Sequence, residues 1–148
     1  MPKNGQPKTV MSIAELDGFL HKEFPEFYAQ GGLTIERLDP MICRLRQSYH
    51  PRMLRPGRTI SGPTLMGLAD VCMYAAILSM IGPVGLAVTT NLNINFLRKA
   101  AEGRDVIGEG RLLKLGKRLA VGEVTLLSDG SEEPVAHATL TYSIPPAA

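Results

Sequence analysis

Cysteine is scarce in this sequence. Cys43 and Cys72 are the two cysteines among 148 residues, and they lie far apart without the spacing of metal or redox motifs. This excludes a disulfide framework and fits a reducing cytoplasm. His21, His50 and His137 are also scattered without metal-ligand spacing. We therefore expect no metal, no cofactor and a cytoplasmic location.

The sequence also has no large excess of charge of one sign and no apolar segment long enough to span a membrane. Sixteen basic and fourteen acidic residues give a net charge of +2, too small to favour nucleic acid or a membrane as a partner. The N-terminus has no basic segment followed by an apolar one, and the longest apolar run, residues 71–81, is too short to cross a bilayer. We expect a soluble, uncleaved protein.

The composition that is present fits one globular domain over residues 1–148, with a flexible lead-in at 1–11. Ser12 and Glu15 have the spacing of a capping box, and apolar residues recur at helical spacing through residues 12–28. Residues 33–39 and 41–49 alternate like two paired strands, followed by a loop at 50–58.

A second helix starts at Ser61-Gly62-Pro63-Thr64 and ends at Gly82-Pro83. It is apolar nearly all round, so we expect it to be buried. Four strands follow as a meander, with short turns between them, at residues 86–97, 105–115, 119–127 and 134–142. The fold class is α+β: an antiparallel sheet wrapped around a long central helix, with an extra N-terminal helix.

Asp70 is the one charged residue between Arg58 and Arg98, and it lies within the apolar helix. A charge in apolar surroundings costs several kcal/mol unless it is paired, and such groups gather at functional sites. The alternative is a carboxylate that reaches the helix edge and is solvated or hydrogen-bonded there. Periodicity does not decide between the two.

Four segments resemble the hotdog-fold thioesterases of the phenylacetate-pathway (PaaI-like) group, which cleave acyl-CoA thioesters. These segments are ISGPTLMGLAD (60–70), TTNLNINFLR (89–98), LGKRLAVGEV (115–124) and AHATLTY (136–142). The resemblance extends over residues 56–144. It implies the hotdog fold and an acyl-CoA thioesterase that uses no cofactor beyond the CoA of its substrate.

In that family a His-Gly-Gly sequence opens the helix, and an acidic residue follows eight positions after the first glycine. Gly62 and Asp70 keep this spacing. The resemblance implies that the Gly62 amide polarises the thioester carbonyl, while Asp70 activates water or attacks the acyl carbon. Eight helical residues rise about 12 Å, so the two groups of one chain cannot flank one carbonyl. The resemblance therefore implies a site between subunits of a homodimer or a dimer of dimers.

The start of the helix departs from the family pattern. Ser61 stands where the family has histidine, Pro63 where it has the second glycine, and Arg55 where some relatives have asparagine. Ser61 is a helix cap or a catalytic hydroxyl, and capping is favoured because no histidine with an orienting acid is nearby. Arg55 could hold a carboxylate or phosphate and change the substrate class.

Further candidates lie on the strands. Thr89 aligns with a hydroxyl that holds water in some relatives, although an ordinary strand threonine is an equal alternative. Three asparagines, ending at Asn95, share one strand face, where they line the substrate path or satisfy one another. Basic residues at the strand ends fit the CoA phosphates or form a solvated surface.

The candidate catalytic residues are thus Asp70, Gly62, Ser61 and Thr89, and the candidate substrate-binding residues are Arg55, Pro63, Asn95, Arg98, Lys117 and Arg118. The leading function is acyl-CoA hydrolysis, with the acyl group between subunits. The alternative is a non-catalytic hotdog protein that binds an acyl-CoA or a small aromatic or acidic ligand. A dehydratase is less favoured, since its usual Asp and His pair is not apparent.

Overall fold

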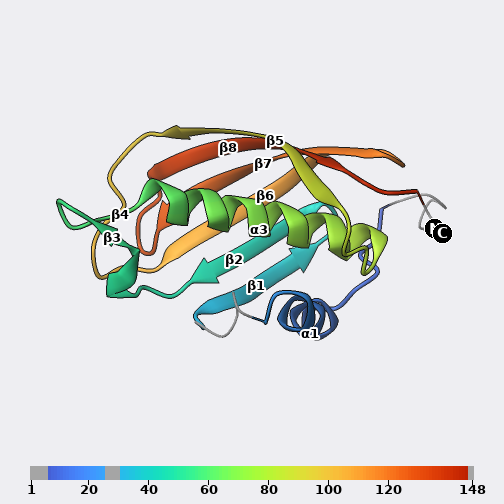
Figure 1. Ribbon diagram of the computed structural model, residues 1–148, viewed down its shortest axis with the longest axis horizontal. Helices are drawn as coiled ribbons and strands as arrows, with labels where there is room; N and C mark the ends of the chain where they lie inside the picture. The colour runs from blue at the N-terminus through green and yellow to red at the C-terminus, as the bar shows by residue number, and fades with distance from the viewer. Residues whose placement is uncertain (1–6, 26–30, 147–148) are drawn as a thin grey trace.

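A computed structural model describes residues 7–25 and 31–146 of the chain. Six strands form one antiparallel sheet, and the long helix α3 lies across one face of it (Figure 1). A shorter helix, α1, lies beside β1 and contacts α3. The expected α+β class, with a long central helix and an extra N-terminal helix, is confirmed.

The elements are α1 (Ile13–Glu23), β1 (Leu33–Asp39), β2 (Ile42–Gln47), a 3₁₀ turn (Pro51–Met53), β3 (Leu54–Arg55), β4 (Thr59–Ile60), α3 (Gly62–Ile81), β5 (Val88–Phe96), β6 (Val106–Leu115), β7 (Leu119–Ser128) and β8 (Pro134–Ser143). Each helix and strand expected from the sequence is present, with ends that differ by a few residues. The small β3–β4 hairpin was not expected, because its strands are too short to show a periodicity.

The N-terminal helix begins as its sequence predicts. The backbone N–H of Ser12 donates to Glu15 Oε1, and the N–H of Glu15 donates to Ser12 Oγ, both at 3.1 Å, which forms the capping box. The helix ends at Glu23, ahead of Pro25, and residues 26–28 of the expected helix lie outside the described residues. Leu16 and Leu20 bury the face that meets the core.

The end of the expected lead-in is packed rather than loose. The backbone N–H of Val10 donates to the carbonyl of Ser79 in α3 at 2.6 Å, and Met11 is buried. Residues 1–6 of the lead-in lie outside the described residues. The segment therefore joins the fold at least from Val10 onward.

Helix α3 is the core of the molecule. It ends at Ile81, and Gly82 takes a φ of 92°, a backbone conformation that favours glycine, as its C-cap. By length and composition α3 could cross a membrane, which the apolar run at residues 71–81 did not indicate, but in this fold most of it is buried. The expectation of a buried central helix is confirmed.

The strand order in the sheet is β1-β2-β6-β7-β8-β5. The predicted meander is correct for β6, β7 and β8 and wrong for β5, which pairs with β8 at the edge of the sheet. Residues 97–105 connect β5 to β6 across the end of the sheet instead of forming a hairpin turn. Within this connection the Ala100 carbonyl accepts a hydrogen bond from the N–H of Ile60 at 3.2 Å. The connection therefore lies beside the start of α3.

Glycine in β7 lets α3 approach the sheet closely. A Cβ at Gly122 would lie 2.6 Å from Met73 Cε of α3 and 2.8 Å from the Arg111 carbonyl, closer than real Cβ contacts. Protein interiors are close-packed, so a helix in such close contact with a strand cannot shift along it without steric clashes. The position of α3 above the sheet is thereby fixed, and so is the distance of Asp70 from the strands that face it.

Candidate active site

Two hydroxyl groups hold the carboxylate of Asp70. Thr89 Oγ1 donates to Asp70 Oδ1 at 2.5 Å, and the Tyr142 hydroxyl donates to the same oxygen at 2.7 Å. Oδ2 accepts no hydrogen bond from the described part of the chain. Asp70 is half-buried and lines a cavity. The side chain is therefore hydrogen-bonded at the helix edge, as one interpretation expected, with one oxygen left for a ligand.

A β-bulge brings Thr89 to this position. Strict alternation places Thr89 on the same face as Asn91, Asn93 and Asn95. The pairing of β5 with β8 shifts between Thr89 and Asn91, so that Thr90 is an extra residue and Thr89 turns to the face of α3. Thr89 is also the cross-strand partner of Tyr142. One bulge thus aligns both donors on Asp70.

Tyr142 is a site residue that the sequence analysis missed. It is 2% exposed, and burial raises the pKa of its hydroxyl well above the usual range, with a smaller contribution from the negative charge of Asp70. The phenol therefore keeps its proton and remains a donor to the carboxylate. In the sequence Tyr142 is one more alternating strand residue, and its register with Thr89 depends on the bulge.

Replacing Tyr142 with phenylalanine is expected to lower kcat about tenfold with little change in KM. The variant keeps the ring and loses one of the two hydrogen bonds to the Asp70 carboxylate, worth about 1.5 kcal/mol, together with the contact of the hydroxyl with the Asp70 carbonyl. Steady-state kinetics on any accepted thioester measure the effect. Tyr49→Phe, at a half-buried tyrosine that does not line the cavity beside Asp70, is the matched control. A rise in KM with unchanged kcat would contradict a role in orienting the carboxylate.

The N-terminus of α3 has one free amide. The N–H of Ser61 donates to the Met53 carbonyl at 2.9 Å, Pro63 has no N–H, and the N–H of Thr64 donates to Ser61 Oγ at 3.3 Å. The N–H of Gly62 has no acceptor among the described residues. It lies at the positive end of the helix, so it can bind an oxyanion. Ser61 is a helix N-cap, the role favoured from the sequence.

The Gly62 amide opens on a cavity of about 650 Å³ with a basic rim. The Phe96 ring covers Gly62, since a Cβ there would lie 3.2 Å from Phe96 Cζ. Arg55, Arg98 and Lys99 line the cavity. Arg98 pairs with Glu133 at 3.2 Å, whereas the side chains of Arg55 and Lys99 form no ion pair within residues 7–25 and 31–146. Two cationic groups are therefore available to an anionic ligand.

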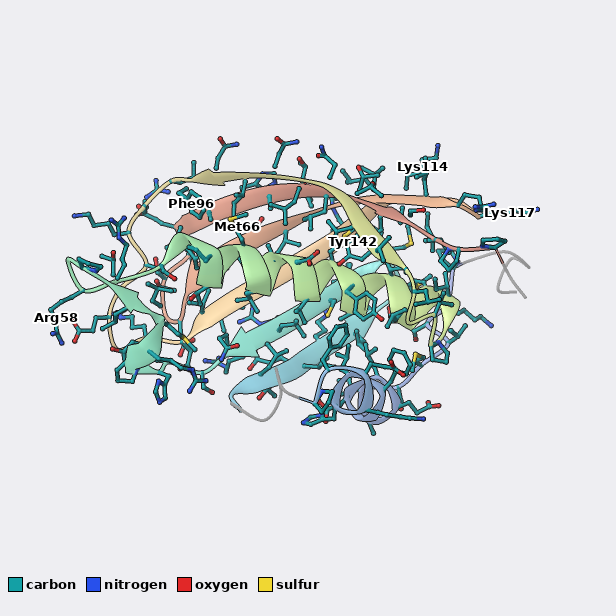
Figure 2. The ribbon with its side chains drawn as sticks, in the orientation of Figure 1. Arg58, Met66, Phe96, Lys114, Lys117 and Tyr142 are labelled. Carbon is teal, nitrogen blue, oxygen red and sulfur yellow. The ribbon has the colours of Figure 1, made fainter. Side chains whose placement is uncertain are left out.

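A second cavity, of about 550 Å³, lies beside Asp70 between α1, α3 and the start of β5. Its apolar lining includes Leu20, Phe24, Val71, Tyr74, Ala87 and Val88. Tyr142 of β8, labelled in Figure 2, also lines this cavity. The carboxylate therefore faces an apolar space, and the free amide faces a basic one.

The remaining predicted residues are placed as follows. Pro63 is exposed at the rim of the basic cavity. Asn95 is exposed outside both cavities, and the neighbouring Asn93 donates to Asn91 at 2.9 Å, so the amides partly satisfy one another. Lys117 and Arg118 lie in the β6–β7 turn, and Figure 2 shows Lys117 at the end of the molecule opposite Phe96. Within one protomer these two cations do not join Gly62. Over the residues described, no group of His, Cys, Asp and Glu could hold a metal ion.

Comparison with known proteins identifies the class. Residues 57–135 match the family model of the thioesterase superfamily. The crystal structure of a presumed thioesterase from Silicibacter sp. TM1040 is similar to this chain, with 46% identity, coverage of 94% of this chain and 95% of its own, and a TM-score of 0.86. The chain belongs to the thioesterase superfamily, and thioester hydrolysis is its general chemistry.

More distant structures share the fold. Zebrafish thioesterase superfamily member 2 is 17% identical, with a TM-score of 0.80 and coverage of 91% of this chain and 99% of its own. A mutant of the phenylacetic acid degradation protein PaaI from Thermus thermophilus is 24% identical, with a TM-score of 0.71 and coverage of 81% and 99%. The expected hotdog fold is confirmed. Comparison with curated proteins gives no match.

Proposed function

We propose that the protein is an acyl-CoA thioesterase, which hydrolyses an acyl-CoA ester to the free acid and CoA. One observation carries the proposal: α3 presents at its N-terminus the Gly62 amide and, eight residues on, the Asp70 carboxylate, and neither this N–H nor Asp70 Oδ2 has a hydrogen-bond partner among the described residues. An oxyanion donor and a base or nucleophile are the two groups that thioester hydrolysis requires.

The active site is completed by a second copy of the chain. Gly62 and Asp70 lie about 12 Å apart along one helix. On the same helix face Pro63 and Met66 are exposed, and Gly67 is half-buried. β5 is an edge strand with exposed apolar side chains, among them Phe96 at 51% and Val88 at 53%. Antiparallel pairing of two copies along this face would bring Asp70 of each beside Gly62 of the other.

The reaction then follows from the two groups. The substrate carbonyl oxygen accepts the Gly62 N–H, and its developing negative charge lies at the positive end of α3. Asp70 Oδ2 takes a proton from water as the water oxygen bonds to the acyl carbon, or Oδ2 attacks that carbon itself and forms an acyl–aspartate anhydride, which water hydrolyses after the thiol has left. The C–S bond breaks, and the thiolate leaves as CoA after taking up a proton. Tyr142 and Thr89 hold the carboxylate throughout.

Thiol release from a panel of acyl-CoA esters tests the proposal. Release with saturation kinetics, and none from matched oxygen esters or from buffer alone, is the expected result. No release, together with thermal stabilisation by the same esters, would favour a non-catalytic binding protein instead. The dimer, the absence of a cofactor and the cytoplasmic location remain predictions.

Arg55 is expected to bind the phosphates of CoA. Arg55→Ala should raise KM for acyl-CoA about tenfold and leave kcat unchanged, because the guanidinium contacts the ligand away from the reacting atoms. The difference in KM between wild type and Arg55→Ala should become smaller at high salt, because salt screens the attraction between the guanidinium and the phosphates. Arg58→Ala is the matched control, since this guanidinium, on the same hairpin, is already paired with Glu102. Equal KM in wild type and Arg55→Ala would contradict the assignment.

A further inference from the structure

We propose that the apolar cavity beside Asp70 binds the acyl group, that it accepts an uncharged hydrocarbon chain, and that Phe24, the C-cap residue of the N-terminal helix, sets the chain length. This inference rests on the proposed acyl-CoA thioesterase activity. The lining residues of this cavity come from one protomer, and its members Gly67 and Val88 also lie on the face of the proposed dimer, in keeping with the acyl group between subunits that the sequence analysis expected.

The lining of the cavity argues against a charged acyl group. Asp70 is the one charged side chain among the lining residues, and all the hydroxyl protons are already donated. The Tyr74 hydroxyl donates to the Gly85 carbonyl at 3.1 Å, and those of Thr89 and Tyr142 donate to Asp70. A carboxylate at the end of an acyl chain would meet the charge of Asp70 and no cation. Such burial is costly, so dicarboxylic acyl groups should be rejected.

Three aromatic rings lead from the carboxylate to the N-terminal helix. Tyr142, bonded to Asp70, stacks on Tyr74 with ring centroids 6.1 Å apart. Phe24 then meets Tyr74 edge to face, with centroids 5.6 Å apart. Phe24 is thus the ring farthest along this series from Asp70. Phe24 lines the cavity at the C-cap of α1 and is 43% exposed, so its ring is not held in the core.

This arrangement predicts a chain-length profile. Each methylene buried against the apolar lining should raise kcat/KM about fourfold. The gain should stop where the chain reaches Phe24, and longer chains should lose activity because the ring must move. A cavity of about 550 Å³ is within the range that holds a small ligand. The optimum should therefore fall at a medium-length chain rather than at acetyl.

The test is hydrolysis of straight-chain acyl-CoA esters from acetyl to dodecanoyl, with succinyl-CoA as the charged counterpart of butyryl-CoA. Wild type should prefer butyryl over succinyl by about a hundredfold. Phe24→Ala should move the optimum to longer chains. Ile13→Ala, an exposed apolar residue on α1 that does not line the cavity, is the matched control. Val71→Phe, which fills the cavity, should move the optimum to shorter chains and keeps the test decisive if Phe24→Ala does not fold.

The outcomes separate this inference from the proposed function. Hydrolysis of the panel with the same profile in wild type, Phe24→Ala and Val71→Phe, or equal rates for succinyl and butyryl esters, would overturn the acyl pocket and leave the thioesterase intact. No hydrolysis of any ester would overturn the proposed function. In that case, thermal stabilisation by octanoyl-CoA but not by succinyl-CoA, lost in Val71→Phe, would still support the pocket.

Discussion

Asp70→Asn is expected to lower kcat about a thousandfold while the protein stays folded and still binds acyl-CoA. Asparagine has the size of aspartate, and its amide oxygen can still accept hydrogen bonds from Thr89 and Tyr142. It can neither take a proton from water nor attack the acyl carbon. Thiol release measures the loss, and calorimetric titration with CoA ester measures binding.

A control variant distinguishes the loss of the Asp70 carboxylate from the loss of one negative charge elsewhere in the protein. Asp17→Asn removes a negative charge from a half-buried position on α1, outside both cavities, and should leave kcat and KM unchanged. Circular dichroism checks that each variant is folded. Full activity in folded Asp70→Asn would remove Asp70 from the mechanism, whatever the substrate.

Gly62→Pro is expected to lower kcat about a hundredfold, the cost of losing one oxyanion donor. Proline removes the N–H and fits the first position of a helix. Any side chain here also presses on Phe96, because its Cβ would lie 3.2 Å from the ring. Gly62→Ala is therefore the matched control: it adds the same Cβ and keeps the amide.

The difference in kcat between Gly62→Ala and Gly62→Pro measures how much the Gly62 N–H contributes to catalysis. Alanine should lose much less activity than proline, and both should bind CoA ester. Equal losses in Gly62→Ala and Gly62→Pro would assign the effect to crowding by Phe96 and would contradict an oxyanion role for the backbone.

The sequence predicted the positions of the helices and strands well, but it predicted less well which strands pair with one another in the sheet. The spacing of apolar residues identified both helices and all six strands of the main sheet, and Gly82 marked the end of α3 correctly. The partner of β5 was wrong, because alternation shows that a segment is a strand and not which strand lies beside it. The nine residues between Phe96 and Val106 are longer than a tight hairpin turn, and this length was the available signal.

For the site, residues on one helix were predictable and contacts across elements were not. The eight-residue spacing of Gly62 and Asp70 was visible along the chain, although their catalytic roles remain predictions. Tyr142 was missed because its contact with Asp70 depends on a bulge at Thr90. Phe24 lies within the range of helical spacing, but its contact with Tyr74 was not predictable, because that contact requires α1 to pack beside α3. Lys117 and Arg118 were predicted to bind substrate from their positive charge alone, and they lie at the end of the protomer opposite Phe96.

The measurement that tests the shared active site most directly is complementation between two inactive variants. Asp70→Asn and Gly62→Pro proteins, mixed in equal amounts and reassembled from denaturant, should form mixed dimers in which one of the two sites has both an intact Gly62 and an intact Asp70. Random assembly predicts about a quarter of wild-type activity in the mixture. Activity no higher than that of the separate variants, with mixed dimers confirmed by mass spectrometry, would contradict a site built from two subunits.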